Sequence, residues 1–135
     1  MKTIHTEPGL AQLQYDPDRK LYVIHWSSYH GPHYRRTLEA MLAEVKKTGL
    51  KTYITDASLA KDVPLSEDFE WVEKVAKPAL VKGGLEKFIT VLPASAIAKM
   101  TTTRIGKVAS SAGLEICQAH SMEEALKFAD GRKAA

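Results

Sequence analysis

The segment HWSSYHGPHYRR, at positions 25–36, holds the densest set of side chains suited to metal or acid–base chemistry. It contains three of the five histidines of the chain, His25, His30 and His33. Neutral imidazole is a good zinc ligand, but a structural zinc site needs about four ligands and a catalytic site about three. The segment holds no cysteine or carboxylate, so a metal would need a distant ligand such as His5 or Asp56. The alternative is a polar loop with hydrogen-bonded or solvated histidines, and we predict no metal site.

The same segment also suits an anion. A helix starting near Pro32 offers free backbone N–H groups and a partial positive charge. The side chains that would form this anion-binding rim are His30, His33, Arg35 and Arg36. Gly31 allows close backbone approach, but Gly31-Pro32 is not a phosphate-loop motif and Pro32 lacks an N–H. The alternative, which the sequence favours, places both arginines on a solvated helix face.

Acidic residues form a third candidate, for acid–base chemistry or magnesium binding. The set comprises Asp56, Asp62, Glu67, Asp68 and Glu70. Glu67 and Asp68 are more simply explained as charges at a helix start. Asp56, at a strand end, is the best functional candidate, and its alternative role is to cap a turn. Nucleophile elbows, glycine-rich phosphate loops and paired-carboxylate signatures are absent from the sequence, so we predict no catalytic residue, no enzyme activity and no cofactor.

The elements that position these side chains follow from the apolar periodicity. The predicted strands are Leu10–Tyr15, Leu21–Trp26, Thr52–Asp56, Phe88–Leu92 and Leu114–Ala119. Four helices are predicted. The first starts at Pro32 and stops at Gly49, and the second starts at Ser66 and is kinked or ended by Pro78. The third covers Ser95–Ser111, and the last starts at a capping box at Ser121. Cys117, on a strand, is expected to be a small buried hydrophobe.

This order, ββαβαβαβα, predicts an α/β fold with a single mixed, mostly parallel sheet. We expect an N-terminal arm at 1–9, one domain at 10–130 and a tail at 131–135. The loop after the second strand and Asp56 should lie at the carboxyl edge of the sheet, where ligands bind in α/β proteins.

Large apolar side chains suggest a further site between the two middle helices and the sheet. Trp26, Phe69, Trp71 and Met100 could line a pocket there. Ordinary core packing is the alternative and is the commoner role for any one of these residues. If the aromatic side chains are instead exposed, they indicate a surface for a partner.

Composition limits the classes of function. The chain has 135 residues, a net charge of +3 and one cysteine, so an intrachain disulfide is impossible. The charges are scattered, whereas nucleic-acid binding proteins usually concentrate them, so we expect no nucleic-acid partner. Residues 1–20 have no apolar core like that of a signal peptide, and the sequence contains no membrane-spanning run, so we expect a cytoplasmic protein. A homodimer is the default assembly.

Several stretches in this order resemble the SpoIIAA-like (STAS/Sec14-like) family of small bacterial proteins. They are Trp26 at a strand end, Tyr34-Arg35 at a helix start, Asp56, LSEDFEWV (65–72), PALVKGGLEKFITVLP (78–93), KMTTTRI (99–105), GLEI (113–116) and EEAL (123–126). The resemblance covers roughly residues 10 to 130. It implies the STAS fold.

The resemblance implies regulation through protein contacts, with a phosphorylatable serine after the third strand in the classical antagonists. Here Ser58 and Ser66 lie in that region, but no glycine follows Ser58, and Glu67 and Asp68 flank Ser66. These departures argue against a phosphoserine switch.

Three hypotheses follow. The leading one is a non-catalytic domain that binds a protein partner through Asp56–Trp71, with Ser58, Ser66, Phe69, Trp71 and Met100 near that surface. The second, suggested by Sec14-like proteins, is a module that binds a small apolar or lipid-like ligand. The third is an enzyme or anion site at the rim formed by His25, His30, His33 and Asp56.

Overall fold

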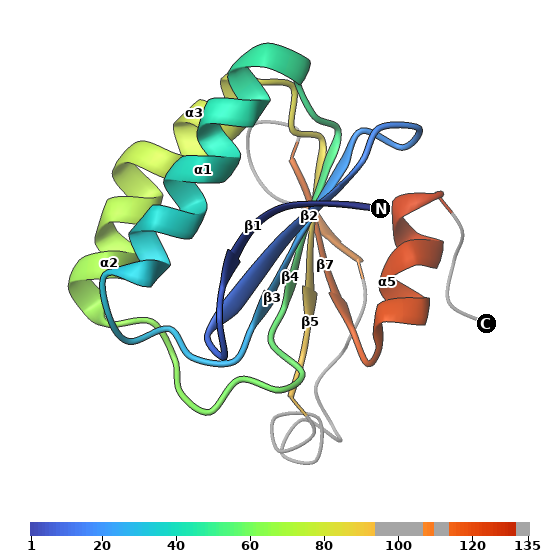
Figure 1. Cartoon of the computed structure of the whole chain (residues 1–135). Helices are drawn as coiled ribbons and strands as arrows, with labels where there is room; N and C mark the ends of the chain where they lie inside the picture. The colour runs from blue at the N-terminus through green and yellow to red at the C-terminus, as the bar shows by residue number, and fades with distance from the viewer. Residues whose placement is uncertain (94–106, 110–113, 132–135) are drawn as a thin grey trace.

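A seven-stranded sheet forms the centre of the molecule, in the order β1-β2-β3-β4-β5-β7-β6 (Figure 1). The computed structural model describes residues 1–93, 107–109 and 114–131. The strands are β1 (Lys2–Glu7), β2 (Ala11–Asp16), β3 (Leu21–Trp26), β4 (Thr52–Asp56), β5 (Lys87–Val91), β6 (Lys107–Ala109) and β7 (Glu115–Ala119).

The sheet is mixed, as predicted, but it is not mostly parallel. The pairs β3–β4, β4–β5 and β5–β7 are parallel, and the pairs β1–β2, β2–β3 and β6–β7 are antiparallel. The sequence prediction missed both outer strands, which supply two of the antiparallel pairs. The predicted β2–β3 hairpin is confirmed, and Asp16 accepts the backbone N–H of Asp18 in its turn.

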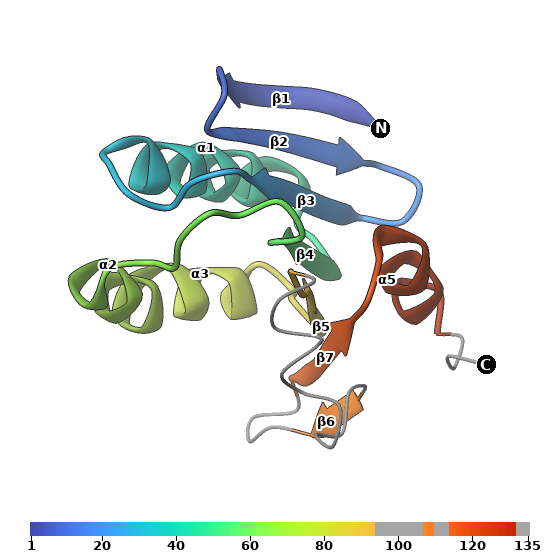
Figure 2. The same cartoon turned by 90° about the horizontal axis from the view of Figure 1, so that it is seen from below.

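Helices cover both faces of the sheet. The helix α1 (His33–Thr48) and the helical run α2 (Ser66–Trp71), η1 (Val72–Ala76) and α3 (Lys77–Lys82) lie on one face, and α5 (Met122–Ala129) lies on the other (Figures 1 and 2). One apolar cluster lies under α1 and α3, and a second lies under α5. None of the helices in the described ranges is long and apolar enough to cross a membrane.

Two segments differ from the prediction. Residues 2–7, expected to be part of an arm, form the edge strand β1, because pairing with β2 satisfies their backbone groups. Residues 107–109, expected to be helical, form β6 on β7. The rest of the predicted helix at 95–111, including Met100 and the threonine run 101–103, lies outside the described residues.

The helical run at 66–82 also departs from expectation. Ser66 does not cap it: the residue before the first turn is Leu65, and no side chain makes a cap hydrogen bond. Pro78 does not end it, because the turn before the proline widens to π geometry, in which the Lys77 N–H donates to the Val72 carbonyl. Pro78 lacks the N–H that an α-helix would use there, and the wider turn accommodates its ring.

Two further helix boundaries follow the predicted chemistry. Gly49 ends α1 with φ 68°, a left-handed conformation that favours glycine. Ser121 caps α5 by accepting the Glu124 N–H, while Glu124 accepts the His120 N–H in return. Cys117 is buried, as expected.

Candidate functional site

The carboxyl edge of the sheet brings together His25 and Asp56, as the parallel register of β3 and β4 requires. The His25 Nδ1 atom lies 2.7 Å from Asp56 Oδ2, and the Ser58 hydroxyl donates to Asp56 Oδ1 at 2.6 Å. Burial alone would raise the pKa of Asp56, but the hydrogen bonds from His25 and Ser58 outweigh it and hold the pKa below its usual value. Asp56 is therefore ionised at neutral pH and acts as an acceptor only, so Nδ1 carries a proton.

The second ring nitrogen of His25 is also occupied. Nε2 lies 2.9 Å from the Gln14 side-chain oxygen. With one nitrogen on Asp56 and the other on Gln14, His25 has no free nitrogen for a metal or for a substrate proton in this arrangement.

The remaining two histidines of the segment hold the loop after β3 in place. His33 is buried and donates from Nε2 to the Ser28 carbonyl at 2.7 Å. His30 donates from Nε2 to the Val63 carbonyl at 2.9 Å. Asp62 accepts the Tyr29 N–H and the Ser28 hydroxyl, which ties this loop to the loop before α2. The sequence prediction weighed Asp62 only as a possible acid or magnesium ligand.

The structure therefore does not bring His25, His30, His33 and Asp56 together as one site. His25 is bonded to Asp56, whereas His30 and His33 are bonded to other groups. Across the described ranges, the side chains of histidine, cysteine, aspartate and glutamate never gather in groups of three or more that could hold a metal.

Both arginines of the predicted anion rim have carboxylate partners. Arg35 donates to Asp68 at 2.8 Å, and its guanidinium lies 5.3 Å from the ring centre of Trp71. Arg36 donates to both oxygens of Glu7, and mainly for this reason the pKa of Glu7 falls to about 2. An anion at this edge would have to compete with these carboxylates.

A cavity of about 470 Å³ lies between the sheet, α1 and the run α2–η1–α3. The sheet side comprises Trp26, Tyr53, Thr55, Phe88, Thr90 and Ile116. The helix side comprises Tyr34, Leu38, Phe69, Val72, Glu73, Ala76, Lys77 and Leu80. The adjoining segments add Tyr29, Pro64, Leu85 and Leu114. Most of these side chains are apolar or aromatic, as in sites for small molecules.

Three aromatic rings close the end of the cavity near the loop after β3. Trp26, Tyr29 and Tyr34 contact one another, with ring centres 4.9 to 5.7 Å apart. Rings in mutual contact leave no gap between them, so the three form a wall of the cavity and not a cage for a cation.

The predicted pocket residues have different positions. Trp26 and Phe69 line the cavity. Trp71 is not among the described lining residues and instead packs beside Arg35. Met100 lies outside the described residues. Sequence reasoning missed Tyr29, because nothing in the strand or helix pattern assigns a loop tyrosine to a cavity.

Exposed apolar side chains lie beside the cavity, on the connection from β4 to α2 and on α2 itself. Leu59 is 79% exposed, Val63 72% and Phe69 57%, and Leu65 is also exposed. We call these four residues the loop patch. Ser58, on this connection, and Ser66, the first residue of α2, are the candidate phosphorylation sites, and both are exposed.

Comparison with known proteins finds no matching family model, curated protein or solved structure.

Proposed function

We propose that the protein binds a small apolar molecule in the cavity between the sheet and the run α2–η1–α3. The observation that carries the proposal is the cavity itself. Its volume of about 470 Å³ falls within the range of roughly 300–1,000 Å³ typical of ligand sites. Its walls are mainly aromatic and aliphatic, so an apolar occupant would gain by leaving water.

A packing defect is the alternative explanation for this space. Protein interiors are close-packed, and voids larger than a water molecule are few. The cavity is far larger than such a void, and rigid aromatic side chains at one end hold its walls apart. The π-helical turn η1 supplies Val72, Glu73 and Ala76 to the wall, and π turns occur frequently at functional sites. These features support a built site.

Filling the cavity tests this proposal. Wild-type protein is expected to enhance the fluorescence of the neutral apolar dye N-phenyl-1-naphthylamine. Ala76 is fully buried and lines the cavity, whereas its neighbour Val75 is exposed and does not. The variant Ala76→Trp should therefore lose dye binding, and the matched control Val75→Trp should retain it. Equal dye binding by both variants, or none by the wild type, would contradict the proposal.

A role in protein contacts is the second candidate, and the loop patch favours it. Monomeric proteins rarely expose large contiguous apolar patches unless they bind something there. The patch lies within Asp56–Trp71, the surface expected from the sequence. Alanine substitutions at Leu59, Val63 and Phe69 should abolish binding of a specific partner captured from the native organism. If every specific partner remained bound, this surface would be excluded.

We also propose that the chain is a distant relative of the SpoIIAA-like (STAS/Sec14-like) proteins and acts without catalysis. The α/β element order after the first hairpin supports the relationship. The hydrogen bonds of His25, His30 and His33 to groups of the protein support a non-catalytic role.

A further inference from the structure

Polar groups on the cavity wall are gathered at one end. Thr55 and Thr90 lie opposite each other in the parallel register of β4 and β5, near the carboxyl ends of both strands. Both line the cavity, and both side chains remain partly accessible. The structure gives the Thr90 hydroxyl no hydrogen-bond partner among the described residues, so it is available to a ligand.

Tyrosine hydroxyls extend this polar end. A side-chain interaction with Thr55 partly offsets the rise in the pKa of Tyr29 and of Tyr53. Burial raises the pKa of Tyr29 to about 12 and also raises that of Tyr34, so both phenols stay neutral. A hydroxyl both donates and accepts hydrogen bonds, so this end can satisfy an alcohol or a carbonyl group.

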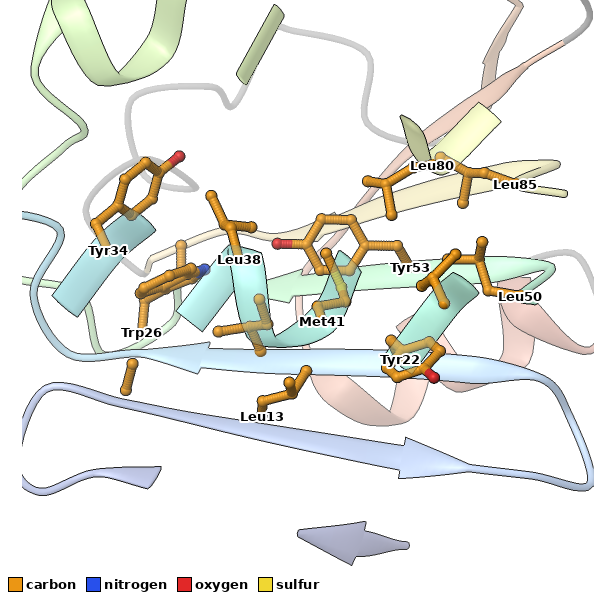
Figure 3. Packing of buried hydrophobic residues seen from close by; sticks show 14 of the residues in the cluster. Leu13, Tyr22, Trp26, Tyr34, Leu38, Met41, Leu50, Tyr53, Leu80 and Leu85 are labelled. Atoms are coloured by element: carbon orange, nitrogen blue, oxygen red, sulfur yellow. The ribbon is translucent and has the colours of Figure 1, made fainter. Parts of the chain in front are cut away.

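The opposite end of the cavity is aliphatic. Leu85 precedes β5 and Leu114 precedes β7, so both lie at the amino edge of the sheet. Leu80 joins them from the end of α3. Figure 3 shows Tyr34 and Trp26 at one side of the cluster and Leu80 and Leu85 at the other, with the Tyr53 hydroxyl directed toward the Trp26 side.

Charge is nearly absent from the walls. Among the described lining residues, only Glu73 and Lys77 are charged. They lie 3.6 Å apart and are about half exposed, so they neutralise each other at the solvent side. An ionised ligand group at the hydroxyl end would lose its hydration with no counter-charge, which is strongly unfavourable.

We infer that the ligand is an uncharged amphipathic molecule, with a hydroxyl or carbonyl group at Thr55 and Thr90 and an apolar body toward Leu80, Leu85 and Leu114. This inference rests on the proposed function, because it assumes that the cavity is a binding site. It goes beyond it by specifying the charge, polarity and orientation of the ligand.

Three probes of matched chain length test the inference: 1-decanol, decanoate and decane, each used to displace N-phenyl-1-naphthylamine at pH 8. The alcohol is expected to displace the dye at a concentration at least tenfold lower than decanoate. It should also displace the dye several-fold more effectively than decane, because only the alcohol satisfies the hydroxyl end.

The variant Thr90→Val removes one hydroxyl at nearly constant shape. It should weaken 1-decanol binding about three- to tenfold, the effect of one hydrogen bond, and leave dye and decane binding unchanged. The control is Thr52→Val. Thr52 is on the same strand as Thr55, but its side chain is on the other face of the sheet, toward α5 and away from the cavity. It should leave all three affinities unchanged.

A pH series gives a measurement that does not depend on any variant. Decanoate binding should strengthen as the pH falls toward the carboxyl pKa, about 4 to 5, because only the protonated acid is neutral.

The possible failures can be told apart. Decanoate binding as tight as 1-decanol at pH 8 would overturn the inference, and so would equal binding of 1-decanol and decane with no effect of Thr90→Val. In both cases dye binding would still support the proposed function. If the dye and all three probes failed to bind, the proposed function itself would be wrong.

Discussion

The rim at the carboxyl edge of the sheet and the cavity beneath the helices differ in what their side chains leave free. At the rim, His25, His30 and His33 each hydrogen-bond a protein group, and Arg35 and Arg36 each pair with a carboxylate. In the cavity, the side chains are of ordinary core type but line a space of about 470 Å³ that is partly open to solvent.

This difference shows why residue type alone misleads. Histidines and arginines suggest chemistry where their nitrogens are free to meet a ligand, and at the rim each of these side chains has at least one nitrogen hydrogen-bonded to a protein group. Aromatic and aliphatic residues suggest only a core, yet here their shapes leave space. The rim stabilises the fold, and the cavity is the better candidate for binding.

The largest expected effect on the free energy of unfolding comes from the rim variant His33→Ala. His33 is 2% exposed and its ring donates to the Ser28 carbonyl, so truncation leaves a cavity and an unpaired carbonyl. We expect a loss of about 3 kcal/mol in the free energy of unfolding, measured with urea. The matched variant His30→Ala, at an exposed position, should cost about 0.5 kcal/mol. Similar costs for the two variants would contradict the roles assigned to them.

An intermediate effect is expected for Asp56→Asn, which weakens the hydrogen bonds with His25 and Ser58. We expect a loss of about 1–2 kcal/mol at pH 7. The folded-state pKa of Asp56 lies below the ordinary value of 3.8. The carboxylate therefore stabilises the fold above about pH 4, and this contribution is lost as the pH falls through the lower folded-state pKa.

The measurement for Asp56 is urea unfolding of wild type and variant between pH 7 and pH 2. The difference in stability should stay constant down to about pH 4 and shrink below it. A difference that did not change over the whole range would show that the charge of Asp56 is not the cause.

The smallest expected effect is that of Glu7→Gln, on the surface pair with Arg36. The pKa of Glu7 is lowered from 4.5 to about 2, so its contribution should be present above pH 4.5 and be lost as the pH falls toward 2. Because the Arg36 side chain is 54% exposed and solvent screens the pair, the change in stability should be smaller than for Asp56→Asn and should nearly vanish in 1 M salt. A salt-independent effect larger than that of Asp56→Asn would reverse this ranking.

Much of the fold was predictable from local pattern. The bounds of β3 and β4 match the prediction, and β2, β5 and β7 differ from it by one residue. The prediction failed at β1 and β6, which lie at the two edges of the sheet. An edge strand is defined by its pairing with a distant segment, and short segments such as KTIHTE and KVA carry little periodicity of their own.

The site was less predictable. The meeting of His25 with Asp56 follows from parallel strand order, so the sequence could indicate it. The sequence could not predict that Thr55 and Thr90 line a cavity, because a cavity depends on the volume left between helices and strands. Alternation along a strand assigns a residue to a face, but it does not tell whether that face is filled.

The π-helical turn η1 has a consequence for changes in the length of the chain. Phe69 and Leu80 are eleven positions apart, and in an uninterrupted α-helix such residues point within about 20° of each other. Here Leu80 is buried and Phe69 is 57% exposed, although both line the cavity. A chain one residue shorter within 72–76 would remove the wider turn, and the Pro78 ring would then clash with the carbonyl four residues before it. Deletion of a residue from this wall is therefore expected to bend or break the helical run, whereas replacement of an exposed side chain such as that of Val75 leaves the turn in place.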